Sequence, residues 1–532
     1  MVSASVLDMS PVVRYTQLPV AHTTDRPASR AYWWVMLFTA LVLLVPLALI
    51  PHLPLVDYPN HLAGAYVLAY YDQVPLFQQT YEIHRVPAPY LAMDVIIAPL
   101  SKMMNVESAG KLFIAFTIIL YCIGCHLLVV AIRGRPTWAV PVACLWFYNS
   151  TTLWGFLNYI FGIATFLIAL ACWLRWRRDW SAPTVVGFAA LAFACYFSHI
   201  ISYLFLGLVM AVVCGYEIWT KRATAAQCAV SLLPGLAPLP AYFLWKHLIS
   251  QQHGTQGSST LVWNSVFGKV ASGPATLIRT YDTRIDVVLA LAWGGLCVYL
   301  LWKSRRTTVV TPLALAAAVF LFLFLALPKD IVSKAYAIGN LDSRFLVPGC
   351  LLLLFAIDVH PGRKAATIAV TVFLVLSIAR LGVLERSWRR MSAQIDEATT
   401  LFQLFPEGAK VLREFQPRDQ LDEKKRDMAL SYVLCYAIPE KRIVDVQFFE
   451  TGHMIALRDR RLLRTESTSE FDGDFYQQFE YVWSYGETPE LMKMLASQGS
   501  RLDSRAGFTV WKLNHEAVRH PTSRLGATAS PP

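Results

Sequence analysis

One acidic and one imidazole side chain, Asp57 and His61, lie four residues apart just after the first long apolar stretch of the sequence. Their segment, residues 51–64, reads PHLPLVDYPNHLAG and follows the apolar run of residues 32–50. An ionisable side chain at the edge of a membrane segment is costly unless it is solvated or paired, so it is a candidate for function. The alternative is a hydrated loop acid beside a helix-capping turn, and these residues alone leave both interpretations open.

Other ionisable side chains also gather where apolar runs end. His199 lies in the tight turn between the runs at 182–197 and 199–218, and Arg344 opens the run at 345–359. The interiors of the runs carry few charges, whereas pumps and channels more often hold ionisable groups in mid-span. The pattern therefore favours a site at the boundary between membrane and water.

Transfer of a sugar from a polyprenyl phosphate needs this combination of groups. A carboxylate takes the proton of an acceptor hydroxyl or amine, and cations stabilise the charge that builds on the phosphate leaving group. Asp57 would be the base, and His61 would share its helical face and either orient it or merely pack beside it. Arg344 would bind the phosphate bidentately, with Lys329 or Lys334 as a point charge nearby in the sequence.

The composition is that of a membrane protein. Of the 532 residues, 55% are hydrophobic and only 16% are charged. A water-soluble chain of this length needs more charge to cover its surface. The formal net charge of +11 then reflects an excess of Lys and Arg in cytoplasmic loops rather than binding to nucleic acid. No spacing of cysteine and histidine typical of a zinc site is present.

Eleven apolar runs predict transmembrane helices, and with them an α-helical polytopic membrane protein. They lie near residues 32–50, 112–131, 137–152, 157–174, 182–197, 199–218, 226–246, 286–302, 308–327, 345–359 and 365–384. Five basic clusters then fall on one side of the membrane, which the positive-inside rule makes cytoplasmic. These clusters are Arg133/Arg135, Arg175/Arg177/Arg178, Lys221/Arg222, Lys303/Arg305/Arg306 and Arg363/Lys364. The N-terminus is predicted inside, and everything after about residue 385 outside.

The sequence predicts four parts. Residues 1–31 form a cytoplasmic tail, and residues 32–384 form the transmembrane domain, with a long first outer loop at 52–109. Residues 385–515 form a small extracytoplasmic α/β domain, and residues 516–532 form a polar tail without a predicted fold.

The α/β prediction for the C-terminal domain rests on the patterning of its apolar residues. Short alternating runs at 442–449 and 507–513 are typical of strands, and the patterns at 393–404 and 489–497 are typical of helices.

The first outer loop holds further candidates. Its stretch 90–104 is apolar but short and contains Asp94 and Pro99, so it predicts a helix that lies in the interface or re-enters the membrane. Asp94 is a candidate second acid if this helix folds back, and its alternative is a solvated position on an interface helix. Glu82 and His84 are other candidates in the same loop. Two more outer loops are long: 248–285, rich in Gly, Ser and Thr, and 328–344, which holds the two lysines.

Three segments resemble the GT-C class of integral-membrane glycosyltransferases, which contains oligosaccharyltransferases, protein O-mannosyltransferases and lipid A aminoarabinose transferases. DYPNHLAGAYVL (57–68) lies where that class keeps its catalytic acid, and RFLVPGCLLLLFA (344–356) is similar to the Arg-aromatic-Leu-x-Pro start of a late span. WGFLNYIFGIATFLIALACWLR (154–175) resembles a Gly-Phe-x-Asn segment of bacterial members. The layout of residues 30–385 is similar as well. One departure is that Asp57 has no adjacent acidic partner, whereas several members carry paired acids there.

The resemblance implies a bacterial inner-membrane enzyme that moves a sugar from a polyprenyl-phosphate donor to a lipid, glycan or protein acceptor at the periplasmic face. Its partners would be that donor and the membrane lipids. No cofactor follows from the residues, and the missing paired acid leaves a divalent metal ion open.

Two alternatives stay open. A polysaccharide polymerase or ligase also has many spans and a large outer loop, but its site would depend on Arg and His. A transporter or flippase would show inverted repeats and broken helices. No clear repeat is visible, although Pro234, Gly235 and Pro238 predict a break in the seventh span.

Overall fold

The computed structural model describes residues 12–16, 29–252, 259–332, 337–445, 455–459 and 473–514. The predicted tail at 516–532 lies outside these residues. The chain divides into two compact units. The helical unit comprises Met1–Leu55 and Arg85–Arg389, and the C-terminal unit comprises Val56–His84 and Arg390–Pro532. The middle of the predicted first outer loop therefore belongs with the C-terminal residues.

Six helices in the described part of the chain are long and apolar enough to cross a membrane. Each contains an apolar window of 18 residues with at most two charged residues. A helix also bonds its own backbone polar groups, as the hydrocarbon of a membrane requires. The six are α1 (Arg30–Leu49), α5 (Val106–Arg133), α8 (Leu157–Trp176), α10 (Ile200–Trp219), α14 (Thr283–Lys303) and α17 (Arg363–Thr399), which continues into η2 (Thr400–Leu404). Helix α17 runs through residue 385, where the sequence predicts a domain boundary.

The predicted number of eleven spanning helices is not confirmed. At 137–152, where the sequence predicts a span, the chain forms two short helices, α6 (Ala139–Cys144) and α7 (Ser150–Leu153). A crossing helix needs about 20 residues, so the prediction of a spanning helix here is wrong. The physical reason is Asn149, whose side chain accepts hydrogen bonds from the backbone of Thr151 and Thr152 and so starts a new helix.

Shorter or bent apolar helices occupy four other predicted spans. Three of them are α9 (Ala182–Ser198), α15 (Thr311–Ala326) and α16 (Ser343–Ala356). The fourth consists of α11 (Ala225–Leu232), η1 (Leu233–Leu236) and α12 (Leu239–Gln252), and it is bent by 49°. The bend lies at Pro234, Gly235 and Pro238, as predicted. The Tyr203 hydroxyl donates to the Gly235 carbonyl oxygen at 2.8 Å, so a side chain satisfies an acceptor at the break.

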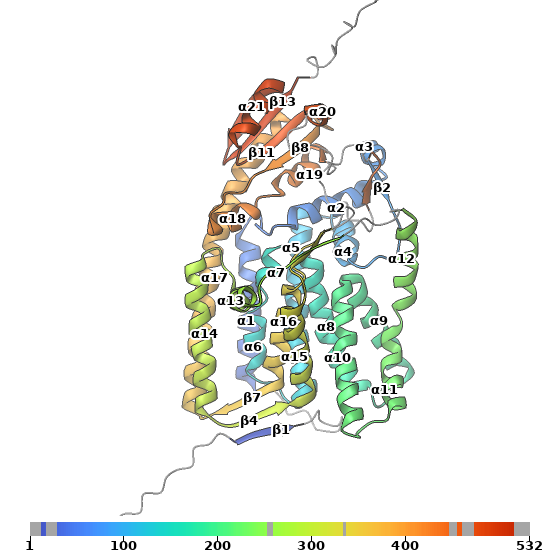
Figure 1. Ribbon diagram of the computed structural model, residues 1–532, viewed down its shortest axis with the longest axis vertical. Coiled ribbons are helices and arrows are strands. Elements are labelled where there is room, and N and C mark those ends of the chain that lie inside the picture. The colour runs from blue at the N-terminus through green and yellow to red at the C-terminus, as the bar shows by residue number, and fades with distance from the viewer. Residues whose placement is uncertain are drawn as a thin grey trace, which may run out of the picture. The chain divides into compact units, whose positions relative to one another are not determined.

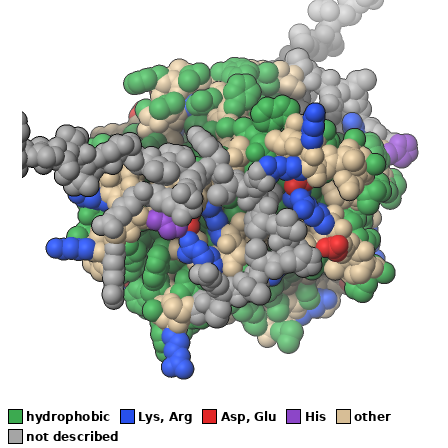
Figure 2. Space-filling view, turned by 90° about the horizontal axis from the view of Figure 1, so that it is seen from below, with side chains coloured by type: hydrophobic (Ala, Val, Ile, Leu, Met, Phe, Trp, Pro, Cys, Tyr) green, Lys and Arg blue, Asp and Glu red, His purple; other side chains and the backbone are tan. Residues whose placement is uncertain are grey.

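A three-stranded sheet lies at one end of the helical unit (Figure 1). Its middle strand β4 (Ser304–Val310) pairs in parallel with β1 (Val12–Thr16) and antiparallel with β7 (Ile357–Pro361). Arg133 donates to the carbonyl oxygens of Phe355 and Ala356, and Arg135 pairs with Asp358 at 2.9 Å. Arg133 and Arg135 thus bind the end of α16 and the strand that follows it, at the end of the unit where Figure 2 shows Lys and Arg side chains on the surface.

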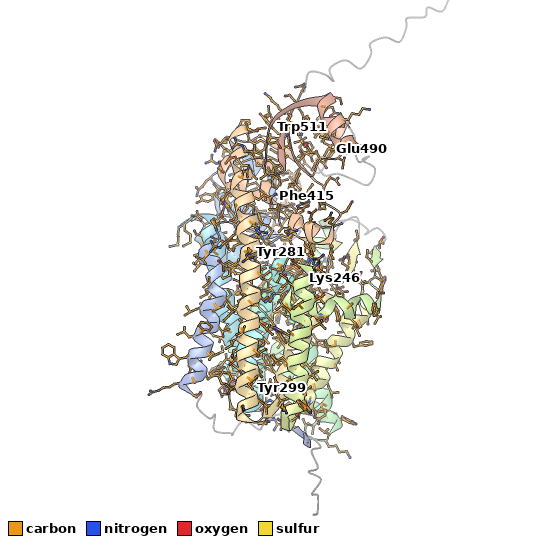
Figure 3. The ribbon with its side chains drawn as sticks, turned by 90° about the vertical axis from the view of Figure 1, so that its left-hand side faces the viewer. Lys246, Tyr281, Tyr299, Phe415, Glu490 and Trp511 are labelled. Atoms are coloured by element: carbon orange, nitrogen blue, oxygen red, sulfur yellow. The ribbon has the colours of Figure 1, made fainter. Side chains whose placement is uncertain are left out.

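A second small sheet joins the chain before α14 to the chain after α15. Strand β5 (Asp330–Val332) pairs antiparallel with β3 (Thr260–Val262) and with β6 (Ala337–Ile338), so the two long loops predicted at 248–285 and 328–344 are joined. Within the first of these loops the chain forms a helix, α13 (Val266–Ile278), which Ser265 caps by accepting a hydrogen bond from Gly268. Figure 3 labels Tyr281 just before α14 and Tyr299 near its far end.

The C-terminal unit is built on a five-stranded sheet with the strand order β12-β13-β11-β8-β9. Strands β8, β9 and β11 are parallel to one another, and β13 runs antiparallel to β11 and β12. The strands are β8 (Lys410–Phe415), β9 (Val444–Asp445), β11 (Tyr481–Tyr485), β12 (Gly499–Arg505) and β13 (Phe508–Leu513). Figure 3 labels Phe415 and Trp511 of this sheet. Strand β13 confirms the predicted strand at 507–513.

Helices and first-loop elements complete the C-terminal unit. The helices between the strands are α18 (Leu421–Met428), η3 (Val433–Tyr436), α19 (Ala437–Lys441), α20 (Gly473–Tyr476) and α21 (Pro489–Gln498). From the first loop come α2 (Tyr58–Tyr70), α3 (Pro75–Thr80) and β2 (Tyr81–Ile83), which pairs antiparallel with β10 (Ile455–Leu457). Helix α2 packs on η3 and α19. The predicted α/β class of the C-terminal region agrees with this arrangement.

Helices α8 and α10 approach closely at Gly162. A Cβ atom at this position would lie 2.4 Å from Ser202 Oγ and 3.3 Å from His199 Cβ. We expect Gly162→Ala to lower the unfolding temperature in detergent, because overpacking a close helix contact costs about 1–3 kcal/mol. The matched control is Gly207→Ala on α10, where a new Cβ would meet nothing within 4 Å. Equal unfolding temperatures for the two variants would contradict this account of the helix contact.

Candidate functional site

Arg344 lies in the first turn of α16, and its guanidinium is held from several sides. Nη1 lies 3.1 Å from Nε2 of His199, and Nη2 donates to the carbonyl oxygen of Gly339 at 3.1 Å. The guanidinium carbon lies 4.5 Å from the centre of the Phe156 ring, a cation–π contact. The structure thus brings together two residues that the sequence singled out, Arg344 and His199.

His199 joins two helices, as the predicted tight turn requires. It ends α9 and begins α10, where its Nδ1 accepts a hydrogen bond from the Ile201 amide at 3.2 Å. Its ring lies edge-on to the rings of Tyr90 and Tyr159, with centroid distances of 4.4 and 5.4 Å. The Tyr159 hydroxyl donates to the backbone oxygen of Arg344. Aromatic and imidazole rings therefore surround the start of α16.

The segment at 155–159 builds much of this site. Phe156 contacts the Arg344 guanidinium, and Asn158 binds the chain just before and within the first turn of α4 (Ala92–Leu100). Its Oδ1 accepts from the Met93 amide and its Nδ2 donates to the Tyr90 carbonyl, both at 2.9 Å. Tyr90 has a φ of 74°, which is strained for a residue with a side chain, and the Asn158 contact stabilises it. The sequence marked this segment by resemblance alone.

Asp94 lies on α4, a helix of nine residues and so too short to cross a membrane. The side chain is buried, and burial raises the pKa of Asp94 from its usual 3.8 to about 7. Within the part of the chain that the structure describes, its Oδ1 has no hydrogen-bond partner. The alternative prediction, in which Asp94 lies on the solvated face of an interface helix, is therefore wrong.

Lys269 is a buried cation that sequence reasoning missed. It is 1% exposed, and its Nζ lies 3.2 Å from Oδ2 of Asp342. Nζ also donates to the carbonyl oxygens of Phe324, Leu325 and Leu327 at the end of α15. Asp342 in turn caps α16 by accepting from the Ser343 amide. The lysine therefore ties the end of α15 to the start of α16, two residues before Arg344.

One of the two predicted loop lysines lies among the described residues. Lys329 Nζ is 3.4 Å from Oδ2 of Asp330, and the lysine side chain is 39% exposed. Its backbone oxygen accepts from the Leu341 amide at 2.7 Å, so the chain at Lys329 is fixed near the turn before α16. Lys334 lies outside the described residues.

In the C-terminal unit, Asp57 directly precedes α2 and is 8% exposed. The Asp57 carbonyl oxygen accepts from the His61 amide at 3.1 Å, so the two residues lie one helical turn apart, as sharing a helical face requires. Burial lowers the pKa of the His61 imidazole to about 4, so this ring is neutral at pH 7. Burial and, after it, the charge of Asp57 raise the pKa of Tyr432, which places Asp57 near this tyrosine.

A buried arginine, Arg413, contacts the ring of Tyr432. The guanidinium carbon of Arg413, on β8, is 4.3 Å from the centre of the Tyr432 ring. Its Nη1 lies 3.7 Å from Oδ2 of Asp445 on β9, a carboxylate that is fully buried. The Cys435 thiol donates to the same Oδ2 at 3.7 Å. These residues had no distinct signal in the sequence, because charged residues in an alternating run usually face water.

The remaining candidates, Glu82 and His84, come from the first loop. Glu82 is an exposed residue of β2, opposite Ala456 of β10, and His84 follows this strand with partial exposure. Among the described residues, no three His, Cys, Asp or Glu side chains group as a metal site requires. The sequence left open whether a divalent metal ion binds, and the described residues offer no set of ligands for one.

Comparison with known proteins finds similarity to a solved structure and not to a family model or a curated sequence. No protein-family model and no curated protein sequence matches the chain. Among solved structures, the crystal structure of ArnT from Cupriavidus metallidurans bound to undecaprenyl phosphate is similar, with a TM-score of 0.49 and 12% identity over 93% of this chain and 100% of that chain.

We expect Asp342→Asn to destabilise the protein strongly. The amide keeps the size of the side chain but removes the negative partner of the buried Lys269, which costs about 3–5 kcal/mol. The control is Asp330→Asn, which alters the partly exposed pair with Lys329 and costs about 1 kcal/mol or less. Denaturant unfolding measures both, and adding Lys269→Met should recover much of the first loss. If Asp342→Asn lowers the free energy of unfolding no more than Asp330→Asn does, the pairing of Lys269 with Asp342 is not the stabilising interaction described here.

The raised pKa of Asp94 predicts a pH dependence of stability. Between its unfolded value near 3.8 and its folded value of about 7, the folded state binds more protons, so stability falls as pH rises through this window. Asp94→Asn should flatten the decline between pH 5 and pH 8 and raise the unfolding temperature at pH 8. The control Asp179→Asn removes an exposed acid and should leave the decline unchanged. If stability varies with pH identically in Asp94→Asn and in the parent protein, the pKa of Asp94 is not raised.

Proposed function

We propose that this chain is a membrane glycosyltransferase that takes a sugar from a polyprenyl-phosphate donor and passes it to a lipid, glycan or protein acceptor. The observation that carries this proposal is the setting of Arg344. Its guanidinium is held by an imidazole, a carbonyl oxygen and an aromatic ring at the start of α16. The far end of α16 leads directly into β7, so Arg344 lies at the end of the helical unit away from the β1-β4-β7 sheet.

A guanidinium in this position suits a lipid phosphate. The donor's phosphate would stay at the membrane–water boundary while its chain lies in the hydrocarbon. Arg344 would bind the phosphate oxygens and stabilise the charge that develops as the sugar leaves. The Lys329 ammonium, on the chain fixed beside the same turn, would add positive charge, and Lys334 is proposed for the same role. His199 would position the guanidinium.

Asp57 is the proposed base. In the reaction, the bond between the anomeric carbon and the phosphate oxygen breaks, a bond from that carbon to the acceptor forms, and the acceptor's proton passes to a carboxylate. Asp57 is nearly buried, which strengthens its interactions with nearby groups, and neutral His61 on the next turn would orient it. Asp94 is the proposed second acid, because a carboxyl with a pKa of about 7 exchanges a proton readily at neutral pH.

The proposed orientation follows from the basic clusters. They gather at the end of the helical unit that carries the β1-β4-β7 sheet, where Arg133 and Arg135 bind β7 and the end of α16. By the positive-inside rule this end is cytoplasmic. The N-terminus would then lie in the cytoplasm, and the Arg344 end and the C-terminal unit would face the periplasm of a bacterial inner membrane.

One observation favours a transporter as the second candidate. The pair α11–η1 and α12 is bent by 49°, and broken helices are typical of substrate sites in transporters. Such sites use freed backbone groups to bind ions or substrates, whereas here the Tyr203 hydroxyl occupies the Gly235 carbonyl. The stretch 233–238, LPGLAP, also carries no ionisable residue. The break therefore supports transport less well than Arg344 supports transfer.

The assay for the proposal uses purified full-length protein and a radiolabelled polyprenyl-phosphate sugar. We expect Asp57→Asn to slow transfer by about 10²–10⁴-fold, the usual contribution of a general base, with donor binding unchanged. We expect Arg344→Ala to weaken donor binding by about tenfold or more, since a charge-assisted bond to phosphate is lost.

Asp72→Asn serves as the matched control, because Asp72 is an exposed acid of the same unit as Asp57. Full transfer activity in Asp57→Asn would remove Asp57 as the base. Donor binding unaffected by Arg344→Ala, together with movement of the labelled lipid between leaflets, would favour the transporter.

A further inference from the structure

Helix α13 presents an apolar side outward and its charged residue inward. Val266, Phe267 and Val270 are 58, 82 and 58% exposed, and Trp263, just before the helix, is 55% exposed. Over residues 259–278 the sequence holds one ionisable side chain, Lys269, and this side chain is 1% exposed. The helix therefore has the reverse polarity of a helix on a water-facing surface.

The exposed apolar residues lie along one side of the helix, and Ser272 is an exposed polar residue away from that side. The outer stripe, as we name it, consists of Trp263, Val266, Phe267, Val270, Ala271 and Pro274, all of which are exposed. Within the helix, Val270, Ala271 and Pro274 follow Phe267 by three, four and seven residues, and Val266 directly precedes it, so the helical members share one face. In a water-soluble protein such a face turns toward the core, because burying it is favourable by about 25 cal/mol per Å².

The inward contacts fix the rotation of the helix. Lys269 reaches Asp342 and three carbonyl oxygens at the end of α15. One turn further on, Gly273 faces Leu346 and Phe324, and a Cβ atom added at this glycine would lie 3.7 and 3.9 Å from their nearest side-chain carbons. Turning the outer stripe inward would remove a buried ammonium from all of its partners, which is far more costly than leaving the stripe outside.

The outer stripe adjoins a surface that is already lipid-facing in character. Helix α13 packs against α14, one of the helices able to cross a membrane. On α14, Val287, Val288 and Leu291 are 53, 64 and 71% exposed. Helix α13 itself has 13 residues, a length of about 20 Å at 1.5 Å per residue, which is too short to cross.

We propose that the outer stripe lies in the hydrocarbon of the lipid leaflet at this end of the helical unit, so that α13 is a membrane-embedded helix that does not span. Lipid chains are the occupant that the chemistry selects. The stripe has no charge to match a charged partner, and its helix packs against α14, which itself exposes Val287, Val288 and Leu291. This inference stands independently of sugar transfer. Its consequence is that the inner side of a lipid-embedded helix holds Asp342, two residues from Arg344.

The test places a nitroxide label on the stripe in full-length protein reconstituted into phospholipid nanodiscs. Phe267→Cys is labelled in a Cys297→Ser background, because Cys297 is the exposed cysteine among the ten of the sequence. Val270→Cys is a second labelling site in case the first variant fails to fold. The control is Leu421→Cys on α18, a charged helix where Leu421 is 62% exposed.

Power-saturation EPR compares collisions with oxygen, which concentrates in lipid, and with a water-soluble nickel complex. We expect the ratio of oxygen to nickel collisions to be at least about fivefold higher at 267 and 270 than at 421, since the apolar face of a helix at a membrane is buried about 5–10 Å into the boundary between headgroups and acyl chains. Ratios at 267 and 270 equal to that at 421 would show a water-facing stripe and overturn the proposal. Low collision rates with both reagents would also overturn it, by showing that another protein surface covers the stripe.

Discussion

The buried contact between Lys269 and Asp342 is the constraint on which the candidate phosphate site depends. A lysine that is 1% exposed persists in the folded state only because a carboxylate and three carbonyl oxygens surround it. The positive charge lies at the C-terminal end of α15, where the helix dipole favours a cation. Its partner Asp342 caps α16. One ion pair thereby joins two helix ends and holds the turn that carries Arg344.

A second set of contacts to Arg344 comes from an earlier part of the sequence, the segment at 155–159. Phe156 lies against the Arg344 guanidinium and Tyr159 bonds to its backbone oxygen. Between them, Asn158 holds the strained backbone at Tyr90. Strain of this kind costs of order 1–3 kcal/mol and persists only where several contacts support it. Arg344 is therefore placed by contacts made both within α16 and from the 155–159 segment, which restricts the positions open to its guanidinium.

Much of the fold could be predicted from apolar periodicity, and the exceptions have local causes. The sequence located α8, α10, α21 and β13 correctly because their patterns are long or strictly alternating. It missed the break at Asn149, where a side-chain cap competes with helix continuation. It also missed α13, because Gly, Ser and Thr indicate a loop unless the apolar stripe among them is recognised. Arg344 and His199 could be singled out by their place at span ends, whereas Lys269 could not, since burial of a lone lysine depends on a partner 73 positions later in the sequence.

The surroundings of Asp57 show why its chemistry cannot be derived from the first loop alone. The acid lies near Tyr432, and Tyr432 stacks against Arg413, which pairs with the fully buried Asp445. These neighbours come from β8, β9 and the chain before η3, more than 350 residues after Asp57. Residues that lie more than 350 positions away in the sequence are therefore part of the surroundings of the proposed base, so the first loop alone could not show them.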